Sequence, residues 1–378
     1  MSASSYFYSL EDDEMVSSYR CPGYDPLAPN RWINGQGYFF RQKGFDQLRL
    51  CKPGDKVINY LFVHIDAGLF SWFLRLLDWL TIVHVNQATD RFRVFACLFD
   101  NRVSGKPSVF QVDNLPPNTP DKINYWDELF EPLSFYSDLV DAKRSDARHH
   151  VYHIRKFSNV LPPHFQLRPH LDTFMPEFRN YFCCTPVLYK HTQFSRFRQH
   201  FYPILQTYIR PKPGVVNKVE RFLVENGKTE EQRWLGIHVR VPVHHYITSR
   251  SNADVMQYYT SILESIRPIT AQENPSVIFV ATESQEFLDL MQKEYGSRRI
   301  RSLAIPRVVG NIDWDDYKHK SQTISLGQEL ENALLDMLLL SKCDFLLGGV
   351  SNMFLTALLF NPTVRFQLIP FLENHQGH

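Results

Sequence analysis

Two segments in the C-terminal half of the chain carry side chains suited to binding an anion. The first is the apolar run 234–240, which reads as a β-strand and ends in His238 and Arg240. Alternation puts these two side chains on one face of the strand and Ile237 and Val239 on the other. A guanidinium there can hold a pyrophosphate by charge-assisted hydrogen bonds, and the imidazole can contact a phosphate or a base edge. A salt-bridged arginine and a packed histidine are the structural alternative.

The second segment begins with a predicted helix over 326–342. Its apolar residues recur at the spacing of a core-facing helix, and Asp336 interrupts them. A carboxylate among apolar neighbours is costly unless it is paired, and the N1 and N2 hydrogens of guanine are a suitable pair of donors. A salt bridge along the helix face would satisfy the carboxylate equally well.

The same segment continues into the glycine-containing turn 348–351 and a further helix. Two glycines allow a ligand close to the backbone, and Ser351 is a good N-cap. The amides of Asn352 and Met353 would face a phosphate with the helix dipole behind them. A tight connection between a strand and a helix also uses glycines, so the turn alone does not establish a ligand site.

The elements that would position these residues follow a repeated pattern. From about residue 234 onward, short apolar runs alternate with amphipathic stretches, which indicates βαβ units and a parallel sheet whose carboxyl edge binds ligands. Proline residues near 211–213 place a junction between an N-terminal domain, 1–215, and a C-terminal domain, 216–378. The predicted strands are 56–65, 92–99, 234–240, 277–281, 300–305, 344–348 and 364–368, and the predicted helices are 69–83, 215–225, 254–266, 284–295, 326–342 and 352–360.

Composition excludes several classes of protein. The chain has 378 residues, with 41 Lys and Arg against 40 Asp and Glu, so its net charge of +1 provides no field that would collect nucleic acid. The apolar runs are interrupted by polar residues and the N-terminus lacks a signal-peptide core, so we expect no transmembrane segment and a cytoplasmic location. The six cysteines lack the spacing of a zinc site, and free thiols are expected.

Three ordered motifs resemble the fucosyltransferase superfamily, which includes α1,6-fucosyltransferases, nodulation fucosyltransferases and protein O-fucosyltransferases. The motifs are LGIHVR (235–240), VIFVATESQEFLDLMQKEYG (277–296) and LLDMLLLSKCDFLLGGVSNMF (334–354). Upstream, NYWDELFEP (124–132) and YIRPKPGVVNKV (208–219) are similar to two further elements of the family. The resemblance implies a GT-B fold, in which two Rossmann-like domains face a cleft, with the acceptor at the N-terminal domain and the GDP-sugar at the C-terminal one.

The resemblance also implies an activity, which is transfer of fucose from GDP-fucose to a glycan or glycoprotein, with inversion and without a metal or further cofactor. His238 and Asp336 would contact the guanine or ribose region, and Arg240 would hold the β-phosphate and stabilise the leaving group. The implied donor-site residues are His238, Arg240, Thr282, Glu283, Asp336, Ser351, Asn352 and Met353.

The sequence departs from the family pattern at two places. Several relatives carry a second arginine directly after His-x-Arg, whereas this chain has the stretch 241–243, Val-Pro-Val, and Glu283 stands where the relatives have aspartate. The sequence therefore does not identify the general base. The two candidate positions are the adjacent histidines His244 and His245, nearby in the sequence, and Asp66, at the end of a predicted strand; exposed loop histidines and a helix N-cap are their structural alternatives.

Three other functions fit parts of the sequence. Asp313 and Asp315 form a D-x-D pair that could hold a divalent metal in a transferase of the GT-A type. The missing second arginine is compatible with a GDP-sugar-binding protein that has lost catalysis. A transferase using a different nucleotide sugar also fits, because the predicted contacts select the base more directly than the sugar.

Overall fold

The computed structural model separates into two compact units, residues 1–182 with 203–212 and residues 183–202 with 213–378. The second unit thus includes 183–202, which precede the predicted boundary at 215. The residues that the structure describes are 7–8, 31–32, 57–64, 69–85, 92–97, 122–123, 125–131, 133, 148–154, 186–241, 251–310 and 325–374.

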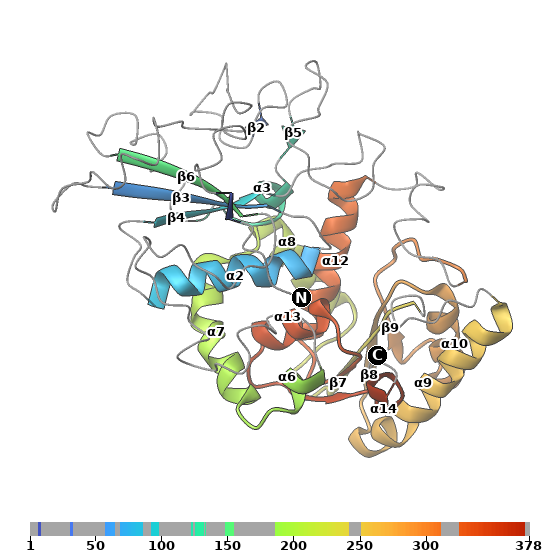
Figure 1. Cartoon of the computed structure of the whole chain (residues 1–378). Helices are drawn as coiled ribbons and strands as arrows, with labels where there is room; N and C mark the ends of the chain where they lie inside the picture. Colours follow the sequence, from blue (N-terminus) through green and yellow to red (C-terminus); the bar gives the residue numbers. More distant parts are fainter. Residues whose placement is uncertain are drawn as a thin grey trace. The chain divides into compact units, whose positions relative to one another are not determined.

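The first unit contains a sheet with the strand order β1-β6-β3-β4, of which Figure 1 labels β6, β3 and β4. Its central strand β3 runs parallel to both β6 and β4, and β1 is antiparallel to β6. Helix α2 packs on β3 and β4, and most of its described side chains are buried. The bounds are β1 (Phe7–Tyr8), β2 (Arg31–Trp32), β3 (Val57–His64), α2 (Leu69–Val85), β4 (Phe92–Cys97), β5 (Lys122–Ile123), α3 (Tyr125–Leu129) and β6 (Arg148–Ile154), with β2 paired to β5.

The two upstream motifs lie next to each other in this unit. Phe130, directly after α3, forms an isolated antiparallel bridge with Pro211. The amide of Lys212 donates to the carbonyl of Leu129 at 2.9 Å, beside this bridge. Trp126 stacks on Phe130 with ring centroids 3.9 Å apart, and both side chains are buried. The described residues 125–131 and the segment 208–212 therefore contribute to one local structure of this unit.

The second unit is an α/β structure around a five-stranded parallel sheet, as the sequence predicts. Its strand order is β11-β10-β7-β8-β9, so the chain builds outward from β7 in one direction and then crosses to β10 to continue in the other. The bounds are β7 (Trp234–Val239), β8 (Val277–Thr282), β9 (Ile300–Arg301), β10 (Phe345–Gly348) and β11 (Arg365–Leu368).

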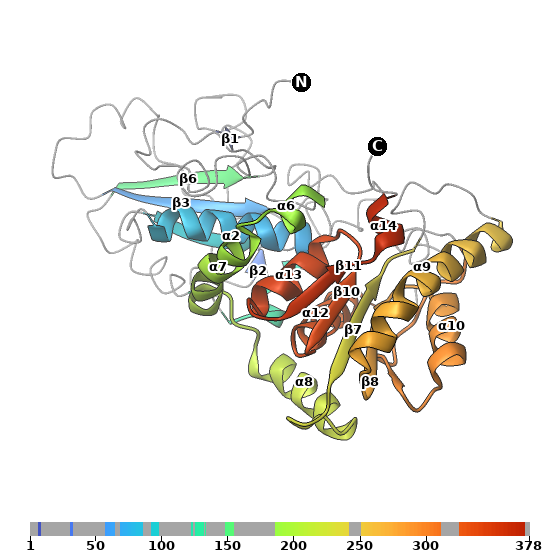
Figure 2. The same ribbon diagram turned by 90° about the horizontal axis from the view of Figure 1, so that it is seen from below.

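Helices cover both faces of this sheet (Figure 2). On one face lie α9 (Asn252–Glu273), α10 (Gln285–Tyr295) and α14 (Pro370–Asn374); on the other lie α8 (Pro213–Glu225), α12 (Leu326–Ser341) and α13 (Asn352–Phe360). Two further helices, α6 (Pro186–Lys190) and α7 (Phe194–Tyr208), precede them in the chain, and α7 begins in the second unit and ends in the first. None of the described helices combines the length and hydropathy needed to cross a membrane.

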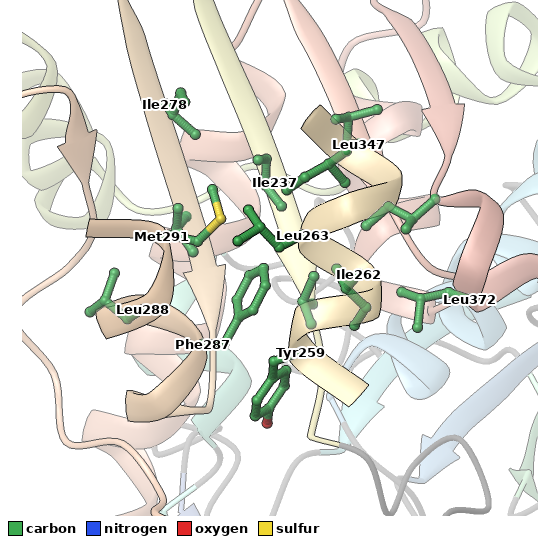
Figure 3. Close-up of a cluster of buried hydrophobic side chains, with 14 of the residues drawn as sticks. Ile237, Tyr259, Ile262, Leu263, Ile278, Phe287, Leu288, Met291, Leu347 and Leu372 are labelled. Atoms are coloured by element: carbon green, nitrogen blue, oxygen red, sulfur yellow. The ribbon is translucent and has the colours of Figure 1, made fainter. Parts of the chain in front are cut away.

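Successive side chains of β7 lie on opposite faces of the sheet. Ile237 is buried with α9 and α10 in an apolar cluster, and Figure 3 shows it converging there with Leu263 and Phe287. The opposite face carries Gly236, where an added Cβ would lie 2.5 Å from Leu346 Cδ2. A side chain at that position would collide with the packing between the sheet and α12.

Two predicted elements differ from the observed ones. The strand predicted at 300–305 is only two residues long, and the helix predicted at 254–266 continues to Glu273 despite Pro268. Burial of Ile266 and Ile269 against the sheet accounts for this extension, because tertiary packing outweighs local propensity. The helix ends at Asn274, whose φ of 42° is left-handed and whose amide donates to Thr270 O.

Candidate functional site

The carboxyl ends of β7 and β10 form the natural ligand-binding edge of the second unit. These two strands are neighbours, and the connections that follow them leave in opposite directions, which is the switch point where open parallel sheets bind ligands. Gly348 is in register with His238, and His238 is in register with Ala281. The two segments singled out in the sequence, 234–240 and 348–353, therefore meet at this edge.

His238 lies on the α12 face of the sheet, and Arg240 and Glu283 directly follow the ends of β7 and β8. The His238 side chain is buried, and its Nδ1 is 3.2 Å from the carbonyl oxygen of Ala281. Arg240 Nη2 is 4.0 Å from Glu283 Oε1, and about a third of each side chain is exposed, 36% and 32%. This arrangement leaves a guanidinium that an incoming anion can reach, beside a carboxylate that competes for it.

Thr282 belongs to the other face of β8. It shares this face with Ile278 and Val280, which pack in the apolar cluster with α9 and α10. Its Oγ1 accepts a hydrogen bond from the amide of Ser284 at 3.2 Å, and Ser284 is the N-cap of α10. The structure therefore gives the Thr282 hydroxyl a role in the turn and does not bring it together with His238.

Asp336 is the most unusual side chain at this end of the unit. It is 5% exposed, and its Oδ1 is buried without a hydrogen-bond partner among the described residues. Burial raises the pKa of its carboxyl from 3.8 to about 7; the Arg307 guanidinium acts in the opposite direction and the Glu283 carboxylate adds to the rise. The helix-face salt bridge that the sequence left open is not formed within the described part of the chain. Asp336 Oδ1 is therefore a buried acceptor that can still accept a hydrogen bond from a further donor.

Arg307 is a feature of this site that the sequence did not reveal. It is 9% exposed and donates through Nε to Thr282 O at 3.2 Å and through Nη2 to Leu303 O at 2.8 Å. Burial lowers the pKa of its guanidinium, and the Asp336 carboxylate opposes that effect. Val308 N donates to Glu283 O at 2.7 Å, so the backbone also holds this segment at the end of β8. A lone arginine in a loop offers no periodicity or motif that would have singled it out.

The turn after β10 is built around the start of α13. Ser351 is its N-cap and accepts from Phe354 N at 3.1 Å, which confirms the capping prediction. Gly348 is required by packing, because an added Cβ would lie 2.6 Å from the ring of Phe354; this agrees with the tight-connection alternative, and close approach of a ligand to the backbone stays a prediction. Asn352 and Met353 occupy the first turn, where the helix itself offers no carbonyl to the amides.

Several predicted residues lie outside the described part of the chain. These include the candidates for the general base, and also the D-x-D pair. Val241, which stands where relatives carry a second arginine, is described and fully buried. Among the described residues, no group of three or more His, Cys, Asp or Glu side chains is placed to hold a metal ion. The predicted residues outside the described ranges are Asp66, His244, His245, Asp313 and Asp315.

No family model and no curated protein matches the chain. Solved structures do match it. Fucosyltransferase NodZ from Bradyrhizobium has a TM-score of 0.43 and 15% identity, covering 79% of this chain and 92% of that one. POFUT1 in complex with GDP has a TM-score of 0.44 and 9% identity, with coverage of 84% and 99%. Arabidopsis thaliana FUT1 in complex with GDP has a TM-score of 0.40 and 13% identity, with coverage of 85% and 72%.

Of these three structures, NodZ is described as a fucosyltransferase, and the three sequence motifs resemble the fucosyltransferase superfamily. Because their TM-scores lie below 0.5 and their identities at or below 15%, the activity of this chain has to be inferred from its own residues.

Proposed function

We propose that the chain is a glycosyltransferase that binds a GDP-sugar at the switch point of its second unit. The observation that carries the proposal is the buried carboxylate of Asp336, whose Oδ1 has no partner among the described residues. An uncompensated acceptor of this kind is costly, and it is rarely retained unless a ligand supplies the donor.

Guanine fits this acceptor better than the other common bases. Its Watson–Crick edge presents two adjacent donors, N1–H and N2–H, which a carboxylate can accept together, whereas uracil presents one donor and adenine pairs its amino donor with an acceptor. Hydrogen bonds to a charged acceptor are the strong ones, each contributing about 1.5–3 kcal/mol. His238, buried beside β8, would line the ribose or base region.

The phosphates of the donor would lie between Arg240 and the start of α13. Arg240 is partly exposed, and the first-turn amides of Asn352 and Met353 carry the positive end of the helix dipole. Glu283 lies 4.0 Å from Arg240, so donor binding requires the arginine to exchange one anionic partner for another. Ser351, the N-cap of α13, would contribute to phosphate binding through its backbone.

The chemistry required of such a site is modest, because a glycosyl pyrophosphate already has a good leaving group. Preorganised positive charge from Arg240 and α13 would stabilise the departing GDP, and losing one comparable donor lowers rates by about 100- to 1,000-fold. We propose inversion at the anomeric carbon without a metal, as the motif resemblance implies. A base from the first unit or from the loop after β7 would take the acceptor proton, with Asp66 and His244 as candidates.

The sugar and the acceptor are the finer parts of the proposal. Fucose is favoured by the order and spacing of the three motifs in 235–354, and a glycan or glycoprotein acceptor by the same resemblance. The first unit would hold the acceptor, and the two units would face a cleft as in GT-B enzymes.

Calorimetric titration with a series of nucleotides tests the donor assignment. GDP is expected to bind, and inosine diphosphate, which lacks the N2 amine, to bind at least about tenfold more weakly because one hydrogen bond to a charged acceptor is lost. Asp336→Asn should remove most of the affinity for GDP. Glu331→Gln is the matched control, because it also converts a carboxylate of α12 to an amide, at a partly buried position where Glu331 pairs with Lys218 of α8. Binding of UDP in place of GDP would overturn the assignment.

A GDP-sugar-binding protein without transferase activity is the second candidate. Its support is Val241, a buried apolar residue where several relatives have a second arginine. Incubation with GDP-fucose separates the two functions. An active transferase is expected to release GDP slowly by hydrolysis even without an acceptor, while an inactive binder would return the intact donor.

A further inference from the structure

A short aromatic segment outside the three sequence motifs contacts the proposed phosphate turn. Tyr189 lies in α6, in the part of the chain that precedes the predicted domain junction but belongs to the second unit. Its side chain is 6% exposed, and its hydroxyl donates a hydrogen bond to the carbonyl oxygen of Ser351 at 3.0 Å. Ser351 is the N-cap of α13, so this contact reaches the peptide at which that helix begins.

The ring of Tyr189 is fixed by other aromatic side chains. It stacks on Phe354 with centroids 6.0 Å apart and an interplanar angle of 27°, and it lies 5.4 Å from the ring of Phe194. Phe354 in turn covers Gly348, where no Cβ could be accommodated. The hydroxyl of Tyr189 therefore contacts one end of the turn 348–351, and its ring packs on the side chain that covers the other end.

Arg198, in α7, attaches the aromatic segment 189–198 to the edge of the sheet. It is 6% exposed, donates through Nη1 to the carbonyl of Val364 at 3.0 Å, and lies 5.5 Å and 5.2 Å from the ring centroids of Phe194 and Phe366. Val364 directly precedes β11. The segment that carries Tyr189 is thus attached to the rigid sheet on one side and to the start of α13 on the other.

The geometry of the peptide bond gives the hydroxyl contact a consequence for ligand binding. The carbonyl of Ser351 and the amide of Asn352 belong to one planar, trans peptide, so fixing the direction of the oxygen also fixes the direction of the N–H. The same oxygen accepts from Leu355 N at 3.0 Å in the first turn of the helix. Two donors on one carbonyl polarise the peptide and strengthen its N–H as a donor.

We propose that Tyr189 is a positioning residue of the donor site, which orients the Ser351–Asn352 peptide so that its amide is directed at the donor pyrophosphate. The proposal rests on the proposed function, because it assumes that a nucleotide diphosphate binds at this turn. Tyr189 itself does not contact the ligand; it acts through the peptide that it holds.

The test compares ligands with and without phosphates. Tyr189→Phe removes only the hydroxyl and keeps the aromatic packing, so the melting temperature should change little. The dissociation constant for GDP should rise by about two- to tenfold, the effect of one neutral hydrogen bond, while that of guanosine, measured by competition, should not change. Tyr295→Phe is the matched control, because it removes another buried hydroxyl at the far end of α10 and should leave the binding of both ligands unaltered.

Each result decides a different point. An unchanged GDP affinity in Tyr189→Phe, or an equal loss of GDP and guanosine affinity, would overturn the positioning role while the proposed function stands. Failure of the wild-type protein to bind GDP would overturn the proposed function and the positioning role with it. A second variant, Tyr189→Leu, should lose the ring packing as well, with a lower melting temperature and a GDP affinity below that of Tyr189→Phe.

Discussion

Replacing Asp336 with asparagine is expected to stabilise the protein at alkaline pH. The carboxyl pKa is 3.8 before burial and about 7 in the folded chain, so between these values the folded protein holds a proton that the unfolded chain has released. Stability therefore falls as the pH rises through this window and stays reduced above it. At 1.36 kcal/mol per pKa unit the full penalty is on the order of 4 kcal/mol, of which about 2–3 kcal/mol develops between about pH 5 and about pH 8.

Asparagine has nearly the same shape but no titration in this range. The free energy of unfolding from urea titrations, compared between Asp336→Asn and wild type, should shift in favour of the variant by about 2–3 kcal/mol from about pH 5 to about pH 8. Under the proposed function the same variant should bind GDP about 100-fold more weakly, since the amide meets the guanine donors with a donor of its own. Parallel pH profiles for the two proteins would refute the presence of a buried charge at Asp336.

Three further substitutions test the rest of the site. Arg240→Ala should lower the rate of transfer by about 100- to 1,000-fold in a GDP-release assay, with an unchanged melting curve; turnover like the wild type would contradict a role in leaving-group stabilisation. Glu283→Gln should tighten GDP binding by up to about fivefold in calorimetry, because it removes the carboxylate that competes for Arg240, and a weaker affinity would instead make Glu283 a ligand contact. Gly348→Ala should lower the free energy of unfolding by about 1–3 kcal/mol through collision with Phe354, and a variant as stable as the wild type would show that the ring moves aside easily.

The parallel sheet of the second unit could be predicted from the sequence because its strands are short apolar runs with helical periodicity between them. The alternation of β7 was enough to assign Ile237 to the core and His238 to the opposite face, as the structure confirms. The N-cap at Ser351 was also predictable, since capping depends on a side chain and the amide three residues later.

Residues that act through tertiary contacts could not be predicted in the same way. Arg307 is important because its guanidinium reaches backbone carbonyls around the end of β8, and nothing local in 303–308 marks it. Tyr189 lies 162 residues before Ser351 in the chain, and an aromatic residue in a short helix is ordinarily read as core. The clash that requires a glycine at 348 could not be predicted either, because the ring that excludes a side chain comes from the following helix.

The free-energy penalty for burying the Asp336 carboxylate and the stabilisation expected from the proposed ligand are of comparable size. A ligand at a free concentration of about 1,000 times its dissociation constant stabilises the folded state by about 4 kcal/mol. This matches the penalty on the order of 4 kcal/mol expected for this carboxylate at neutral to alkaline pH. Arg307 opposes part of that penalty through its charge, yet all three hydrogen bonds that it forms to described residues go to backbone carbonyls and none goes to Asp336. The second unit would thus fold with Asp336 Oδ1 left as an unsatisfied acceptor, and its stability should respond to guanine nucleotides more strongly above about pH 7 than below it, where protonation already neutralises the carboxyl.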